Sequence, residues 1–207
     1  LGENTESQNI SSETLKIASI NLLSSNENFE KVASFIDEGS FDIVFFLEIN
    51  DKWQQKIETI DGYPFQFHIP RPDNFGIGVI CNMDGKELKL LSTHTAPPIS
   101  SKFFEFRNNQ FDEINTFVNE IDEELVLIGD FNSTVFSPNM KTLLNNDRLV
   151  DSRIGFGLLH TWNDLMPINL ITLDHAFVTN GINVFNRGVG RSIGSDHLPI
   201  ILEIGMK

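Results

Sequence analysis

The sequence predicts an α/β (α+β) fold in which two mainly antiparallel sheets pack face to face between outer helices, a four-layer α-β-β-α sandwich. Short apolar runs outnumber the helical segments and mostly follow one another as hairpins. The helical segments each carry one apolar face, as a helix that covers a sheet must. An apolar fraction of 40% with 18 Phe among 207 residues is enough for one sizeable core.

We expect one domain over residues 15–207, after a polar and flexible lead-in over residues 1–14. No apolar run approaches the roughly 20 residues that span a bilayer. The single cysteine, Cys81, excludes an internal disulfide and a thiolate zinc cluster. The formal net charge of −14, with no basic block, predicts a surface that repels polyanions unless cations bound locally reverse its sign.

The first half of the chain reads as strands interrupted by two helices. Strands are expected at residues 15–21, 42–49, 65–68, 75–81 and 88–94, with helices from Asn26 or Asn28 to Gly39 and over residues 52–60. Residues 70–74 form a turn. The connection between Val79 and Leu88 is short, and is either a true deletion or a place where residues of the native protein are absent.

The second half begins with a long amphipathic helix. After Ala96-Pro97-Pro98, its apolar face is marked by Phe104, Phe111, Ile114, Val118 and Ile121. A buried strand follows from Leu125, and Ser137 caps a short helix over residues 138–144. Residues 150–157 read as a loop, residues 170–178 and 182–185 as strands, and a last apolar run follows His197.

Polar side chains recur where these strands end. Asp130 and Asn132 follow the buried run from Leu125, and in an extended backbone their side chains face one spot. An ordinary turn is the alternative reading, since Gly, Asp and Asn favour turns. Other strands end in the same kind of residue: Asn21, Glu48, His94, Asp174, Asp196 and His197.

Glu48 is the best candidate metal ligand. A carboxylate at the end of so apolar a strand is costly to desolvate unless a cation compensates it, and a salt bridge to Lys or Arg is the alternative. Hard oxygen ligands without thiolates favour Mg²⁺ or Mn²⁺ over zinc. Asn21 and Asp196 could complete the metal shell.

His197 is expected to pair with Asp174 and not with Asp196, because adjacent residues on a strand point to opposite faces. For the same reason Ser195, Asp196 and His197 cannot form a serine-hydrolase triad. His94 is a catalytic or substrate-binding candidate whose alternative is a structural histidine. Trp162 and Arg107 are candidates for lining the pocket, against the default readings of a core tryptophan and a solvated arginine. His68, His160 and His175 are expected to be structural.

The motifs Gly129-Asp130-Phe131-Asn132 and Ser195-Asp196-His197, with Asn21 and Glu48 before them, resemble those of the endonuclease/exonuclease/phosphatase (deoxyribonuclease-like) superfamily. The resemblance implies the same four-layer fold, a metal-dependent phosphoesterase activity and catalytic roles for Asp174 and His197. Relatives often carry an acidic residue at the position of Leu23, so a second metal is less well supported. Relatives usually also place further strands between residues 79 and 88.

Thr93-His94-Thr95 and Arg107-Asn108-Asn109-Gln110 resemble a bacterial subgroup in which membrane-spanning segments often precede this domain. An extracytoplasmic or membrane-tethered position is therefore an expectation, through a segment outside this chain. We expect a monomer without a protein partner, acting on a small or membrane-presented phosphodiester or phosphomonoester. Nucleic acid is disfavoured by the net charge. The alternatives are a nuclease of the same family and a catalytically silent binding module.

Overall fold

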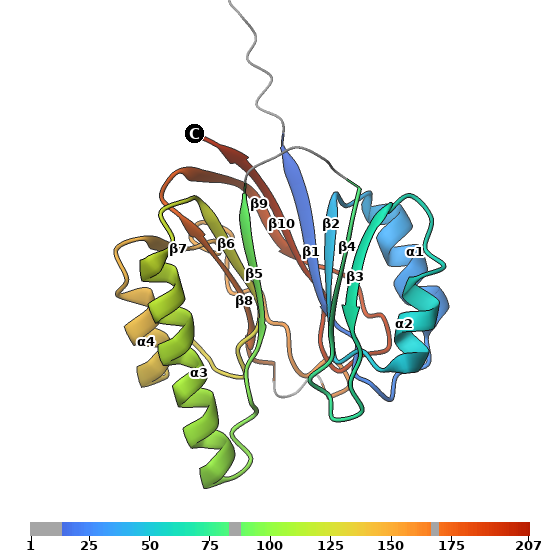
Figure 1. Ribbon diagram of the computed structural model, residues 1–207, viewed down its shortest axis with the longest axis horizontal. Coiled ribbons are helices and arrows are strands. Elements are labelled where there is room, and N and C mark those ends of the chain that lie inside the picture. The colour runs from blue at the N-terminus through green and yellow to red at the C-terminus, as the bar shows by residue number, and fades with distance from the viewer. Residues whose placement is uncertain (1–13, 83–87, 167–169) are drawn as a thin grey trace, which may run out of the picture.

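The computed structural model describes residues 14–82, 88–166 and 170–207. The expected lead-in lies outside this range apart from its last residue, and so do residues 83–87 of the short connection. Within the described part, two sheets face each other and helices cover their outer faces, which gives the four layers in Figure 1. The predicted α-β-β-α sandwich is confirmed.

The larger sheet has six strands in the order β3-β4-β2-β1-β10-β9. Their bounds are β1 Leu15–Asn21, β2 Ile43–Leu47, β3 Phe65–Ile69, β4 Ile77–Cys81, β9 Ile182–Val189 and β10 Ile200–Met206. Most pairings are antiparallel, as predicted, but β1 runs parallel to β2 with Asn21 opposite Leu47. Both of these strands therefore deliver the residues that follow them to the same edge of the sheet.

The smaller sheet has four strands in the order β5-β6-β8-β7. Their bounds are β5 Lys89–His94, β6 Leu125–Asp130, β7 Leu149–Asp151 and β8 Asp174–Thr179. The prediction of a loop from residue 150 was wrong at its start, because β7 pairs with β8 as a short edge strand there. Predicted strand 170–178 begins only at Asp174, since Leu170 to Leu173 pass beside the segment at Thr161 and Trp162.

Helices α1 (Phe29–Gly39) and α2 (Asp51–Ile57) cover the larger sheet, and α3 (Ser101–Glu120) and α4 (Pro138–Leu144) cover the smaller one. The capping residues explain where three of them begin: the side chains of Asn50, Ser100 and Ser137 each accept a hydrogen bond from a backbone N–H of the first turn. Among the described residues, no helix is both long and apolar enough to cross a membrane.

The core between the sheets is apolar and buried. It is formed by Ile17, Ile43, Phe45, Val126, Ile128, Ala176, Ile200 and Leu202, with others around them. Gly129 allows β6 to lie close to β5: its φ is +147°, and a Cβ there would stand 2.0 Å from the Thr93 carbonyl oxygen. Glycine is therefore required at position 129 for Asp130 to lie directly beside His94.

Candidate active site

The strand ends converge because of the register of the two sheets. His94, Asp130 and Asp174 lie directly opposite one another on β5, β6 and β8, so their side chains share the inner face of the smaller sheet. From the larger sheet, Asn21 ends β1 and Glu48 follows β2 at the same edge. The residues expected from separate strand ends thus meet between the two sheets.

Asn21 joins the two sheets at this point. Its Nδ2 donates to Glu48 Oε1 at 3.1 Å and to Asp130 Oδ2 at 3.2 Å, while its Oδ1 accepts a hydrogen bond from the Leu23 N–H at 3.0 Å. One buried amide therefore holds two carboxylates, one from each sheet, within reach of the same point. For Asn21 to serve as a metal ligand through Oδ1, the amide would have to turn over.

Glu48 has a backbone conformation that side chains seldom adopt, with φ of +62°. Its carboxylate also accepts a hydrogen bond from the Ser24 N–H at 3.3 Å, and its side chain is only 12% exposed. Among the described residues, no Lys or Arg forms an ion pair with it, and the nearest cationic candidate is His94 Nε2 at 3.9 Å. The salt bridge that was the alternative reading is thus not found in this part of the chain.

Asp130 and Asn132 do face one spot, but not for the reason predicted. Asn132 has φ of +44°, so the backbone is not extended there. Instead, Asp130 Oδ1 accepts a hydrogen bond from the Asn132 N–H at 2.8 Å, which closes a tight turn. The Asn132 amide then donates to the Thr95 carbonyl at 2.8 Å and lies 3.4 Å from Asp130 Oδ2.

Arg107 supports this turn from behind. Its Nη1 donates to the Asn132 carbonyl at 2.9 Å, and its guanidinium lies over the Phe104 ring at 4.9 Å. The default reading of a solvated arginine was wrong, since Arg107 is buried, and that burial lowers its pKa. Its position on the apolar face of α3, four residues before Phe111, is a sequence signal that could have revealed this.

His197 lies between two buried carboxylates. Its Nδ1 donates to Asp174 Oδ2 at 2.8 Å, and its Nε2 is 3.7 Å from Asp130 Oδ2. Burial opposes the charged imidazole, but Asp174 and Asp130 outweigh it and raise the pKa of His197 to about 10. Burial also raises the pKa of Asp130, to about 6, although His197 and His94 lower it in part. The positive imidazole is the direction that the geometry supports, because two carboxylates face one ring.

The expected pairing of His197 with Asp174 is therefore the one that the contacts show. Asp196 turns elsewhere and accepts a hydrogen bond from the Trp162 indole Nε1 at 2.9 Å. Ser195 Oγ accepts a hydrogen bond from the backbone N–H of His197, so these three consecutive residues do not form a triad. The role of Asp196 as a metal ligand stays a prediction, as does substrate binding by Trp162.

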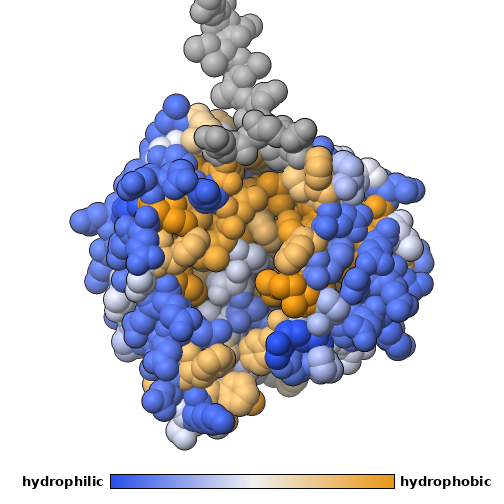
Figure 2. Space-filling model, viewed as in Figure 1, coloured by the Kyte–Doolittle hydropathy of each residue, from blue (hydrophilic) through white to orange (hydrophobic). Residues whose placement is uncertain are grey.

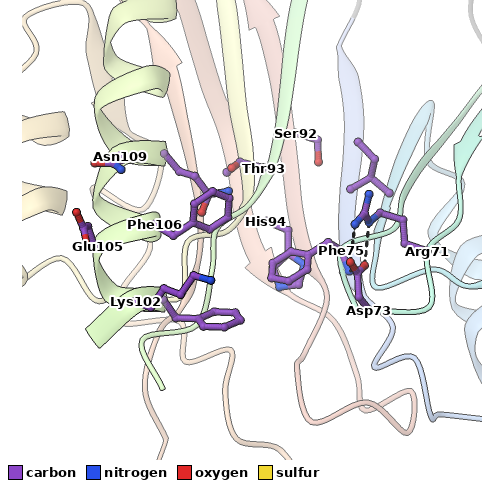
Figure 3. Close-up of a pocket in the computed structure, with 13 residues that line it drawn as sticks. Arg71, Asp73, Phe75, Ser92, Thr93, His94, Lys102, Glu105, Phe106 and Asn109 are labelled. Carbon is purple, nitrogen blue, oxygen red and sulfur yellow. Dashed lines mark hydrogen bonds and ion pairs between the residues drawn. The ribbon is translucent and has the colours of Figure 1, made fainter. Parts of the chain in front are cut away.

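His94 completes the row on the smaller sheet. Its Nε2 is 3.6 Å from Asp130 Oδ2, its ring lies 5.3 Å from the Phe75 ring, and its buried Nδ1 has no partner within the described residues. Figure 3 shows His94 and Phe75 together in a pocket of about 780 Å³ that β5, α3 and the β3–β4 turn enclose. The ring lines this pocket, although Nδ1 itself is buried and does not reach the pocket surface.

His175 has the contacts of a structural histidine, and the same expectation for His68 and His160 stays a prediction. His175 is fully buried and stacks on Phe177, its Nε2 bonds to the Ser133 carbonyl at 2.9 Å, and burial lowers its pKa to about 4. Burial likewise lowers the pKa of His68. Sequence reasoning missed Thr161, a buried residue whose Oγ1 accepts hydrogen bonds from the Leu173 and Asp174 N–H groups. No motif marks it, although its neighbour Trp162 was expected to line the pocket.

The donor set suits a divalent cation that prefers oxygen. Ligand-type atoms of Asp130, Asp174 and His197 lie within 4.8 Å of one another, but a positive His197 ring cannot bind a cation, so the carboxylates are the donors of this group. Glu48 adds a carboxylate that has no Lys or Arg partner in the described chain and is linked to Asp130 through Asn21. Two largely buried carboxylates without a Lys or Arg partner in the described chain are costly in water-poor surroundings, and a bound cation removes that cost.

Comparison with known proteins agrees with this chemistry. The model of the Endonuclease/Exonuclease/phosphatase family matches residues 18–197. Similar solved structures include D. rerio TDP2 complexed with single strand DNA product, with 14% identity, a TM-score of 0.75, and coverage of 94% of this chain and 100% of that one. A mannosyl-6-phosphatase from Bacteroides thetaiotaomicron has 18% identity and a TM-score of 0.67, over 92% and 99% of the two chains.

A further structure, an endonuclease/exonuclease/phosphatase family protein from Bacteroides thetaiotaomicron, has 17% identity and a TM-score of 0.72, over 94% and 98% of the chains. At such identities these likenesses show the fold alone. No curated protein matches this chain in sequence. The family model, however, covers most of the chain, and its members are hydrolases of phosphate esters that depend on a divalent metal. The chain belongs to the endonuclease/exonuclease/phosphatase family.

Proposed function

We propose that this protein is a Mg²⁺- or Mn²⁺-dependent phosphoesterase that hydrolyses a phosphodiester or phosphomonoester with an activated water. One observation carries the proposal: the Asn21 amide holds the carboxylates of Glu48 and Asp130 together from opposite sheets, with no Lys or Arg ion pair to either within the described residues. A paired site of this kind, beside a charged His197, fits a phosphoryl group and not an apolar ligand.

Glu48 is the residue that would anchor the metal, with Asp196 and a turned Asn21 as further candidates. When bound, such a cation supplies positive charge that polarises a phosphoryl oxygen. Oxygen donors without any thiolate favour Mg²⁺ or Mn²⁺ over zinc. The buried carboxylate of Glu48 matches that preference.

Asp130 is placed to orient the attacking water and accept its proton. Its Oδ2 lies between two imidazoles, 3.6 Å from His94 Nε2 and 3.7 Å from His197 Nε2. The same oxygen accepts a hydrogen bond from the Asn21 amide. His197 faces two carboxylates, which favours a positive ring that donates to the phosphoryl oxygens and disfavours its use as the base. His94 is a second donor beside it.

Asn132 and Asp174 act on their neighbours. The Asn132 turn fixes the Asp130 carboxylate through its N–H, and Asp174 fixes the ring of His197 through Nδ1. Asn132 can also donate to substrate through the amide hydrogen that points toward Asp130. A catalytically silent binding module would not need the whole set of polar residues at the strand ends. The chain has all eight of them: Asn21, Glu48, His94, Asp130, Asn132, Asp174, Asp196 and His197.

The substrate is expected to be a small phosphate ester. Lys102, in the first turn of α3, lines the pocket, whereas Arg191 donates to Ser34 and Glu38 and Lys141 lies on α4. Arg71 also lines the pocket but pairs with Asp73. A duplex footprint requires a stripe of Lys and Arg along several phosphates, and this pocket offers little of one. The structural neighbours include one with a DNA product and one named a sugar phosphatase, so nucleic acid stays the second candidate.

The test uses metal-depleted protein and a chromogenic phosphodiester. Hydrolysis should require added Mg²⁺ or Mn²⁺, and Glu48→Gln should lower kcat/KM by about 10³ because it removes the anchoring charge. Glu113→Gln, on the exposed face of α3, is the matched control and should be unchanged. Mn²⁺ should also raise the Tm of the wild type but not of Glu48→Gln, since a ligand that binds only the folded state stabilises it. Full activity in EDTA would contradict the proposal.

A further inference from the structure

Among the described residues, no element covers an apolar wall at the edge of the larger sheet. Phe65, Phe67 and Ile69 of β3 are 51%, 60% and 45% exposed. They lie opposite Cys81, Val79 and Ile77 of β4, in that order, and Val79 lies opposite Phe45 of β2. Because directly paired residues share a face, these side chains point to the inner side of the sheet, toward the second sheet.

The second wall is strand β5, the edge of the smaller sheet. Leu90, Ser92 and His94 lie opposite Val126, Ile128 and Asp130 of β6, so they too face the space between the sheets. Figure 2 shows the result as a hollow lined with apolar surface between the two halves of the molecule. We name this hollow the trough and define it by Phe65, Phe67, Ile69, Val79 and Leu90.

The trough leads into the candidate active site. β4 begins at Ile77 and β5 ends at His94, and both residues line the 780 Å³ pocket together with Phe75 and Ser92 (Figure 3). The apolar wall of β3 ends beside the same turn, which carries Arg71 and Phe75. A molecule whose phosphate lies beside His94 can therefore extend an attached group past Ser92 and along the trough.

We propose that the trough binds an alkyl chain of the substrate, so that the preferred ester is an amphiphile with a phosphate head group. This inference rests on the proposed phosphoesterase function and names its substrate class. The five residues of β3 give the wall a length of roughly 14 Å, enough for a medium-length chain and far more than a methyl or ethyl group needs. The walls contain no charged side chain among the five residues that define them, whereas Lys102 lies at the pocket end, where an anionic head group would be.

The chain length of the substrate should therefore control its affinity. Full burial of one methylene increases binding about fourfold, and burial on one side, as in an open trough, about twofold. From butyl to octyl the value of kcat/KM should rise by roughly tenfold or more, and it should level off once the chain exceeds the length of the wall.

The experiment is a series of alkyl 4-nitrophenyl phosphates, from methyl through butyl and octyl to dodecyl, each below its micelle concentration. Water attacks phosphorus, the bond to 4-nitrophenolate breaks, and the alkyl phosphate remains. The octyl-to-butyl ratio of kcat/KM should be high in the wild type and fall severalfold in Phe67→Thr, which replaces one residue that favours strands by another. Phe185→Thr, at the opposite edge of the same sheet and 46% exposed, should keep the wild-type ratio.

The outcomes separate this inference from the function on which it rests. Hydrolysis that is equal for all chain lengths would overturn the trough and leave the phosphoesterase standing. If no ester is hydrolysed, calorimetry with octyl phosphate and ethyl phosphate still decides: tighter octyl binding that weakens in Phe67→Thr supports the trough, and equal binding refutes it. A dimer in sedimentation that dissociates in Phe67→Thr, with no chain-length effect, would show that a second copy of the chain covers the wall and that the inference is wrong.

Discussion

Changing Asp174 to asparagine tests whether Asp174 and His197 act as one unit. The carboxylate is 2.8 Å from His197 Nδ1, and the two side chains are 4% and 7% exposed. Removing one partner of a buried charged pair costs about 3–5 kcal/mol. If that loss falls on the transition state, kcat should fall by roughly 10²–10⁴.

The double variant provides the decisive number. Two independent losses of this size would multiply, whereas groups that act together lose little more when both are removed. Asp174→Asn, His197→Ala and the double variant should therefore have similar kcat values with a small phosphodiester and saturating metal. The control is Asp151→Asn at the end of β7, which breaks a partly buried ion pair with Arg153. This variant should leave kcat unchanged. Losses that multiply in the double variant would refute the pairing as a functional unit.

Two further predictions concern stability and substrate. Burial lowers the pKa of His175 to about 4 from about 6.5, so between these pH values the unfolded chain binds more protons than the folded chain. The stability contributed by neutral His175 is therefore full above pH 6.5. It is lost as the pH falls toward 4, by about 3 kcal/mol. Urea unfolding should show that His175→Gln lacks this part of the pH dependence, and identical curves would contradict it. In a second assay at about physiological salt, small phosphate esters should be turned over faster than plasmid DNA, because few basic residues line the pocket; efficient nicking with no small ester hydrolysed would show that the charge argument is wrong.

The sequence predicted the layers and the strand ends because both depend on local patterns. Alternation and apolar runs mark strands whatever their partners are, and a polar residue after a buried run is visible without any contact. This is why Glu48, Asp130 and Asp174 could be named. The parallel pairing of β1 with β2 and of β5 with β6 depends on contacts distant in sequence, and no local pattern specifies it.

The details of the site depended on backbone angles and burial that the pattern does not contain. Asn132 was expected to share a face with Asp130 through an extended backbone, but a left-handed turn brings them together. Arg107 was read as solvated because arginine usually is, although its spacing from Phe111 and Ile114 matches the buried face of α3. Spacing along a helix was in this instance better evidence than residue type.

Glu48 has a consequence for how this protein can change over time. Its left-handed backbone costs an ordinary side chain about 1–3 kcal/mol, and its carboxylate is largely buried beside a second one. Glycine would remove both costs, and a single base change converts a glutamate codon to a glycine codon. Folding alone thus favours loss of this residue, so a lineage in which Glu48 persists is one in which its carboxylate is under selection for something other than stability.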